Sequence, residues 1–105
     1  MNESDWKIFT QIKDKAIEQF CSLCFAEFRE VIDDESEHIH ARYLLNYKLV
    51  ESRNKQMSLL FDGHSRSKAW IQLLAIRGEG LADEELVAKL TDEFREKTDP
   101  IRHNW

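Results

Sequence analysis

Hydrophobic side chains recur every three or four residues along the first third of the chain. Between residues 4 and 33 this stripe consists of Trp6, Phe9, Ile12, Ala16, Phe20, Leu23, Cys24 and Val31. Such spacing places them on one side of a helix, so we predict one long helix over residues 4–33. Ile8, Phe25 and Ile32 lie off the stripe. The helix therefore either contacts a second neighbour, which is the simpler interpretation, or leaves Phe25 on a partner-binding surface.

Helical spacing continues from about residue 37 to residue 62, where no proline or glycine interrupts it. The apolar positions there are Ile39, Tyr43, Tyr47, Val50, Met57, Leu60 and Phe61. A strand over residues 43–50 is the alternative, but strict alternation fails because neighbouring leucines would need opposite faces buried. We predict a second helix over residues 37–62, antiparallel to the first, started by Asp34 or Ser36 in a cap position. Further leucines widen its apolar surface, so we expect little of its first half to face water.

The segment 62–66 leaves open whether this helix ends or continues with a kink. Gly63 suits the left-handed position after a helix end, and Ser65 suits an N-cap. A lone glycine also occurs inside helices at a cost of about 1 kcal/mol relative to alanine. The apolar residues 69–76 predict a short central helix over residues 65–77. Gly78 and Gly80 would end this helix. We expect the centre of the core to lie at residues 59–61 and 70–76.

The last helical pattern covers residues 83–97, with Leu86, Val87, Leu90 and Phe94 on one face. Acidic side chains at its start and basic ones at its end suit the helix dipole. The sequence therefore predicts an all-α protein with a single domain over residues 1–105. Its four helices would form an irregular bundle around a long antiparallel first pair, and residues 98–105 would form a C-terminal tail.

Composition agrees with a helical protein in the cytoplasm. One proline and three glycines in 105 residues are too few for the many turns of an all-β fold. No window approaches the ~18 consecutive apolar residues of a membrane span. The N-terminus lacks the basic and apolar regions of a signal peptide, so we expect a cytoplasmic protein that binds no membrane.

Charge is distributed unevenly along the chain. Residues 1–37 contain ten acidic and four basic residues, residues 38–78 two and seven, and residues 79–105 eight and four. The middle is thus basic and both flanks are acidic. Pairing between these segments inside the fold is the simpler explanation. The other is a basic face that is open to an anionic partner.

No motif in the sequence carries recognisable chemistry. Cys21 and Cys24 have C-x-x-C spacing, but they lie within a predicted helix, without the second ligand pair of a zinc site. His38 and His40 would point in roughly opposite directions on a helix. There is no glycine-rich phosphate loop, nucleophile elbow or H-E-x-x-H motif. We therefore predict a protein that is not an enzyme and has no cofactor, metal or small-molecule substrate.

Binding of another protein, or self-association, is the function that we predict. Three tryptophans and six phenylalanines favour an exposed apolar patch and hence a homodimer. The candidate partner surface consists of Phe25, Arg53, Lys55, Arg66, Lys68 and Trp105. One alternative is a nucleic-acid-binding protein that uses the basic segment 42–77, although the net charge of −5 disfavours it. Another is an acidic inhibitor that mimics nucleic acid.

Overall fold

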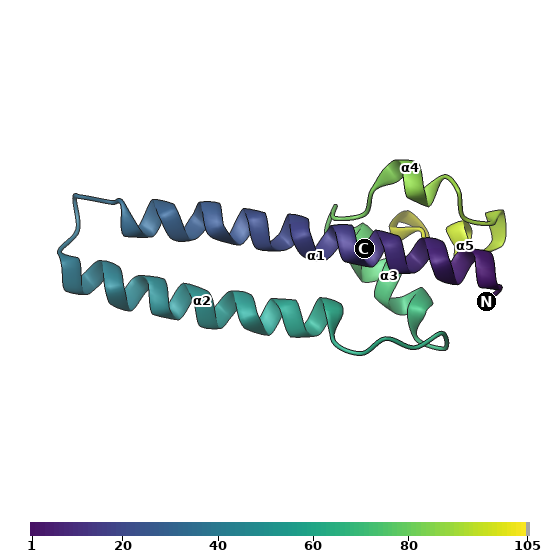
Figure 1. The fold of residues 1–105 in the computed structure, drawn as a ribbon, viewed down its shortest axis with the longest axis horizontal. Coiled ribbons are helices and arrows are strands. Elements are labelled where there is room, and N and C mark those ends of the chain that lie inside the picture. Colours follow the sequence, from purple (N-terminus) through teal and green to yellow (C-terminus); the bar gives the residue numbers. More distant parts are fainter. Residues whose placement is uncertain (105) are drawn as a thin grey trace.

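The computed structural model describes residues 1–104, and its described part is helical without a strand (Figure 1). The predicted all-α class is confirmed. The helices are α1 (Glu3–Ile32), α2 (Ile39–Phe61), α3 (Ala69–Gly78), α4 (Glu84–Val87), α5 (Asp92–Lys97) and the 3-10 helix η1 (Pro100–His103). The first two begin and end within two residues of their predicted bounds.

The molecule is elongated, with extents of 53, 25 and 23 Å. Helices α3, α4, α5 and η1 gather around the N-terminal half of α1, and we call this end the head (Figure 1). Residues 18–32 of α1, the loop 33–38 and α2 up to residue 60 project from the head as a two-helix hairpin, which we call the arm. The N-terminus and η1 both lie at the head.

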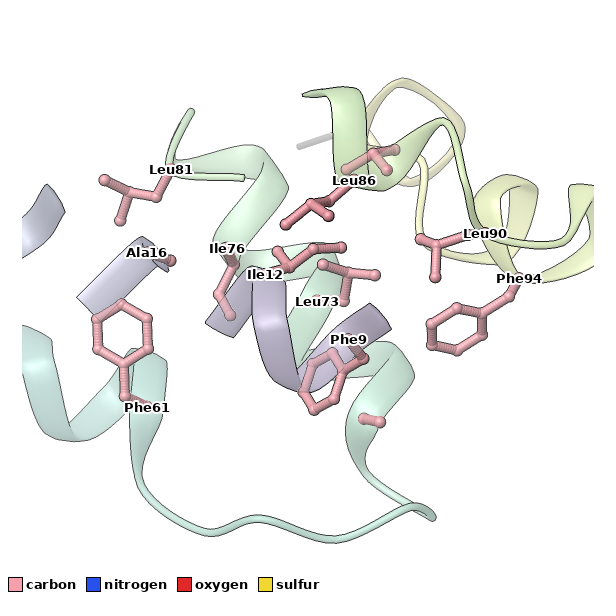
Figure 2. Close-up of a cluster of buried hydrophobic side chains, with 12 residues drawn as sticks. Phe9, Ile12, Ala16, Phe61, Leu73, Ile76, Leu81, Leu86, Leu90 and Phe94 are labelled. Carbon is pink, nitrogen blue, oxygen red and sulfur yellow. The ribbon is translucent and has the colours of Figure 1, made fainter. Parts of the chain in front are cut away.

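The hydrophobic core lies almost entirely in the head (Figure 2). Its largest fully buried apolar side chains are Phe9, Ile12, Leu73 and Ile76, which come from α1 and α3. Leu86, Leu90 and Phe94 close it from the C-terminal segment. Phe61 is the one buried residue that α2 contributes. The arm therefore buries little surface of its own.

Side chains at the helix ends show why the head helices begin and end where they do. Asn2, Asp83 and Thr91 cap α1, α4 and α5, each by accepting a hydrogen bond from a backbone N–H of the first turn. Gly80 has φ of +72° and follows the end of α3. Its N–H donates to the carbonyl of Arg77, and the N–H of Leu81 donates to that of Ile76. This Schellman arrangement needs the left-handed conformation that glycine adopts without strain.

The predicted C-terminal helix over residues 83–97 is wrong in one respect, because α4 and α5 are separate helices. Thr91 interrupts the pattern by capping α5 with its hydroxyl, which accepts from the N–H of Phe94 at 3.3 Å. The same hydroxyl donates to the carboxylate of Asp5, across the head. A tertiary contact thus fixes a break that local periodicity does not show. The predicted tail also contains η1.

The segment between α2 and α3 breaks the helix, which settles the question left open by Gly63. Gly63 has φ of +78°, and residues 62–68 form a loop. The predicted start of the central helix at Ser65 is wrong, because α3 begins at Ala69 and no side chain caps it. The predicted cap of α2 by Asp34 or Ser36 is also wrong, since its N-cap is His38, without a side-chain hydrogen bond.

Lys13 ties this loop to α1. Its Nζ donates to the carbonyl oxygen of Gly63 at 2.5 Å and lies 3.3 Å from Nδ1 of His64. The ring of His64 in turn lies against Trp6 and Phe9, with centroid distances of 4.5 and 5.9 Å. Burial lowers the pKa of the Lys13 ammonium. The loop is therefore held by one cation and a stack of rings.

Candidate functional site

The arm carries most of the large apolar side chains that the protein exposes. Five of them, together with the half-buried Phe28, form one stripe over both helices, which we call the distal face. Its members are Phe25, Phe28, Ile32, Ile39, Tyr43 and Tyr47. Phe28 is half-buried and packs edge-to-face on Phe25, with 6.2 Å between the ring centroids. The exposed fractions of Ile39 and Tyr43 are 78% and 70%, values that are unusual for side chains of this size.

The distal face is exposed because the helices that follow α2 within residues 69–104 pack at the head. A 30-residue helix is about 45 Å long, and the short helices after residue 68 gather at its other end. In addition, α2 begins beyond the last turn of α1 (Figure 1). The inward side of its first turns therefore has no helix opposite. The expectation that little of this half faces water is wrong for the single chain.

A groove of about 520 Å³ runs along the distal face. It is lined by Ile32, Ile39, Arg42, Tyr43, Asn46, Tyr47 and Val50. Two of its polar atoms, Nε of Arg42 and Oδ1 of Asn46, are shielded from water and have no hydrogen-bond partner within residues 1–104. Buried polar atoms are normally paired, so these two are unusual. The groove thus combines an apolar wall with unsatisfied hydrogen-bonding capacity.

A second groove of about 510 Å³ lies where the arm joins the head, and we call it the proximal groove. Leu23 and Leu59 flank it, with exposed fractions of 53% and 86%. Leu59 was predicted to be core and is not. Cys24 is buried at the base of this groove, and burial raises the pKa of its thiol. A thiol in such surroundings is inert, so Cys24 acts as a packing residue.

An ion pair between the two arm helices crosses the proximal groove. Arg53 donates to Glu27 through two nitrogens, Nε to Oε1 at 2.9 Å and Nη2 to Oε2 at 2.5 Å. These hydrogen bonds hold the pKa of the Glu27 carboxyl below its usual value. The pair therefore stabilises the arm whenever Glu27 is ionised. Its contribution is fully present above pH ~4.3, the usual pKa of an unfolded glutamate, and is lost as the pH falls through the folded pKa.

We expect Glu27→Gln to lower the free energy of unfolding at pH 7 by about 0.5 kcal/mol, a small value because the carboxylate is partly exposed to solvent. At pH 3 the variant and the wild type should differ less. Urea denaturation at the two pH values measures both differences. Glu30→Gln is the matched control, because Glu30 is exposed on the same helix and has no ion-pair partner within residues 1–104. An equal loss in both variants would show that the pair contributes nothing specific.

The predicted partner residues do not form one surface. Phe25 lies on the distal face and is 56% exposed. Lys55 is exposed on α2, whereas Arg66 and Lys68 lie in the loop at the head. Trp105 lies outside the described residues. The structure thus separates the apolar candidate from the two basic candidates of the head.

The arginines of the basic middle segment bond within the protein. Arg53 pairs with Glu27, and Arg66 pairs with Glu3 while lying 5.3 Å from the ring centroid of Trp6. The two remaining arginines, Arg42 and Arg77, donate to oxygens of Ile32 and of Arg95 and Thr98. Within residues 1–104, Lys48, Lys55 and Lys68 are exposed and form no ion pair. The segment is therefore paired inside the fold through its arginines and open through its lysines.

Sequence reasoning missed the exposure of Ile39, Tyr43 and Tyr47, which it assigned to a buried stripe. One signal was present. The apolar positions of the second helix cover more of its circumference than one neighbouring helix can bury. This pattern indicated that α1 alone would leave part of the arm uncovered.

The described residues show neither a metal-binding cluster nor a membrane span. No group of three or more histidine, cysteine, aspartate or glutamate side chains within residues 1–104 is placed to hold an ion. Over the same residues, no helix is both long and apolar enough to cross a bilayer. The arm thus offers an exposed apolar stripe and a groove that contains two unpaired polar atoms.

Similarity to known proteins adds nothing to this geometry. The sequence matches no protein-family model, no curated protein and no solved structure. What the protein does has to be argued from the arm and its surroundings.

Proposed function

We propose that this protein is a small non-enzymatic interaction factor that binds a polypeptide through its arm. The single observation that carries the proposal is the distal face, where six large apolar side chains form one stripe with no covering helix. Contiguous apolar surface of this kind marks interaction sites in proteins of this size. The head supplies the fold, and the arm presents the surface. We place this activity in the cytoplasm, as the sequence predicts.

The arrangement of polar groups supports a protein partner over a nucleic acid. A nucleic-acid surface needs several cations directed at phosphates. Arg53 and Arg66, the strongest such candidates, are engaged by Glu27 and Glu3. The distal face itself consists of aromatic and aliphatic side chains. Interfaces between proteins are enriched in tyrosine and phenylalanine at their centre, which is the composition found here.

Affinity capture with the purified chain tests this proposal. We expect Phe25→Gln with Tyr43→Gln to abolish the binding of the polypeptide that the wild type retains, because glutamine keeps the helix but removes apolar contact. The helical circular dichroism of the variant should be unchanged. Binding is measured by retention on the immobilised chain over a range of concentrations.

Ile71→Gln with Ile101→Gln is the matched control. These two residues are exposed apolar side chains of the head, with exposed fractions of 51% and 86%. The control should bind as the wild type does. Failure of the wild type to retain any polypeptide, its own included, would overturn the proposal. Equal loss of binding in both variants would show that the arm is not the specific binding surface.

A further inference from the structure

We propose that the distal face binds a second copy of this chain, with the two arms packed antiparallel. This inference rests on the proposed function, since it names the partner of the same surface. Three independent features of the arm carry it: the area of the apolar face, the unsatisfied groups in its groove and the distribution of charge along its length.

The exposed area is suited to a dimer. A fully buried aromatic side chain covers about 150–250 Å², so Phe25, Tyr43 and Tyr47, which are 56, 70 and 57% exposed, together offer roughly 350 Å². Ile32 and Ile39 extend the same stripe. A stable interface takes about 800 Å² from each partner. The apolar side chains of one arm thus supply nearly half of that area before the polar rim is added.

Asn46 favours an identical partner. Its Oδ1 lacks a hydrogen-bond partner within residues 1–104, and it lines the groove of the distal face. An asparagine side chain has both a donor and an acceptor. Rotation of the side chain would bring Oδ1 out of its shielded position, and two copies of Asn46 related by a two-fold axis would then satisfy each other. A single asparagine among apolar positions is also a known determinant of helix register and oligomeric state.

Charge along the arm sets the orientation of the two copies. The loop at the tip carries four acidic residues, namely Asp33, Asp34, Glu35 and Glu37. Farther along α2, Lys48 and Lys55 are exposed and form no ion pair within residues 1–104. With the two-fold axis at Asn46, antiparallel packing places the acidic tip of each copy beside Lys55 of the other, because Glu37 and Lys55 both lie nine residues from Asn46. Lys48 lies nearer to the axis. Parallel packing would bring the two acidic tips together, which like-charge repulsion opposes.

The dimer is isologous, because the same stripe serves both copies. A closed two-fold arrangement hides both distal faces and leaves none to recruit a third chain. The heads then lie at opposite ends of a bundle of four arm helices. This geometry also explains why the first half of α2 is apolar on more sides than α1 covers.

Sedimentation equilibrium of the purified full chain at low salt tests the inference. We expect a dimer whose dissociation constant rises at least ~30-fold in Tyr43→Gln with Tyr47→Gln, because centrally placed aromatic residues dominate such interfaces. The head variant Ile71→Gln with Ile101→Gln should dimerise as the wild type does. A chain that is monomeric at all concentrations, or a dimer that the tyrosine variant leaves intact, would overturn the inference.

Charge reversal tests the orientation without touching the apolar face. Glu35→Lys with Glu37→Lys should weaken the dimer about tenfold at low salt, because the tip then carries no net charge opposite Lys55. Tip variants that dimerise more tightly would indicate parallel arms, and tip variants that dimerise equally well would show that the tip does not face this lysine. Either result would overturn the antiparallel arrangement. If the wild type is monomeric but still retains another polypeptide through Phe25 and Tyr43, the dimer is excluded while the proposed function stands.

Discussion

Phe9→Ala should lower the free energy of unfolding by about 3–5 kcal/mol, the range for removal of a fully buried phenylalanine side chain. Phe9 of α1 is 0% exposed, and its ring packs in the core near α3 and the loop that Lys13 holds (Figure 2). Its ring also packs on Trp6 and His64, with centroid distances of 5.8 and 5.9 Å. These neighbours belong to different segments, so they cannot collapse together into the space that the ring leaves. Chemical denaturation followed by circular dichroism measures the change.

Phe25→Ala is the matched control, because it removes the same atoms from a side chain that is 56% exposed. Away from buried sites, substitutions usually change stability by less than about 0.5 kcal/mol. Both variants should be compared at one low protein concentration, so that self-association does not add to the stability of the folded state. Similar losses for the two phenylalanines would contradict the division into a buried head and an exposed arm.

Periodicity was sufficient to predict α1 and α2, because long helices repeat the same local signal over many turns. It was not sufficient at Thr91. Leu90 and Phe94 keep helical spacing across that residue, and the break there depends on Asp5, which lies 86 positions earlier in the chain. It also failed for α3, since the loop that precedes Ala69 is fixed by Lys13, which lies 50 positions before Gly63 on α1. Contacts that are distant in sequence decide these boundaries.

The candidate site was only partly predicted, because its exposure also depends on segments that are distant in sequence. Phe25 stood out because it departs from the stripe of its own helix. Tyr43 and Tyr47 did not, because they fit a stripe, and a stripe predicts burial only when something lies opposite. Whether a helix of the same chain packs against these tyrosines depends on how the remaining chain folds. Here it folds at the head, which leaves the tyrosines uncovered.

The structure therefore separates two roles that a compact bundle would combine. Most of the buried side chains lie in the head, so its packing sets the stability of the fold. In the arm the residues buried within the chain are few, and Glu27 and Arg53 form the main polar link between its helices. Regions with little buried surface open locally at low free-energy cost. Binding of a partner along the distal face would stabilise the arm most, since that is where the single chain buries least.

Asp5→Ala should lower the free energy of unfolding by about 2–3 kcal/mol, because it leaves a backbone N–H without its charged acceptor. Asp5 is 3% exposed, and both of its carboxylate oxygens accept hydrogen bonds from Thr91. Oδ1 accepts from the backbone N–H at 2.9 Å and Oδ2 from the hydroxyl at 2.6 Å. The pair joins the first turn of α1 to the start of α5. Chemical denaturation measures the loss of stability. Amide hydrogen exchange should become faster in α5 before it does in the other helices.

Two further substitutions distinguish the lost hydrogen bonds from the lost charge. Asp5→Asn keeps an acceptor for the N–H of Thr91 but no longer presents two oxygens. Its free energy of unfolding should therefore lie between those of the wild type and Asp5→Ala. Glu18→Ala removes an exposed carboxylate from the same helix and should change stability by less than about 0.5 kcal/mol. If Asp5→Ala costs no more than Glu18→Ala, the carboxylate does not hold α5, and the break at Thr91 needs another cause. A loss confined to the Asp5 variants, with faster exchange in α5, would instead establish that one buried side chain near the N-terminus determines where α5 begins.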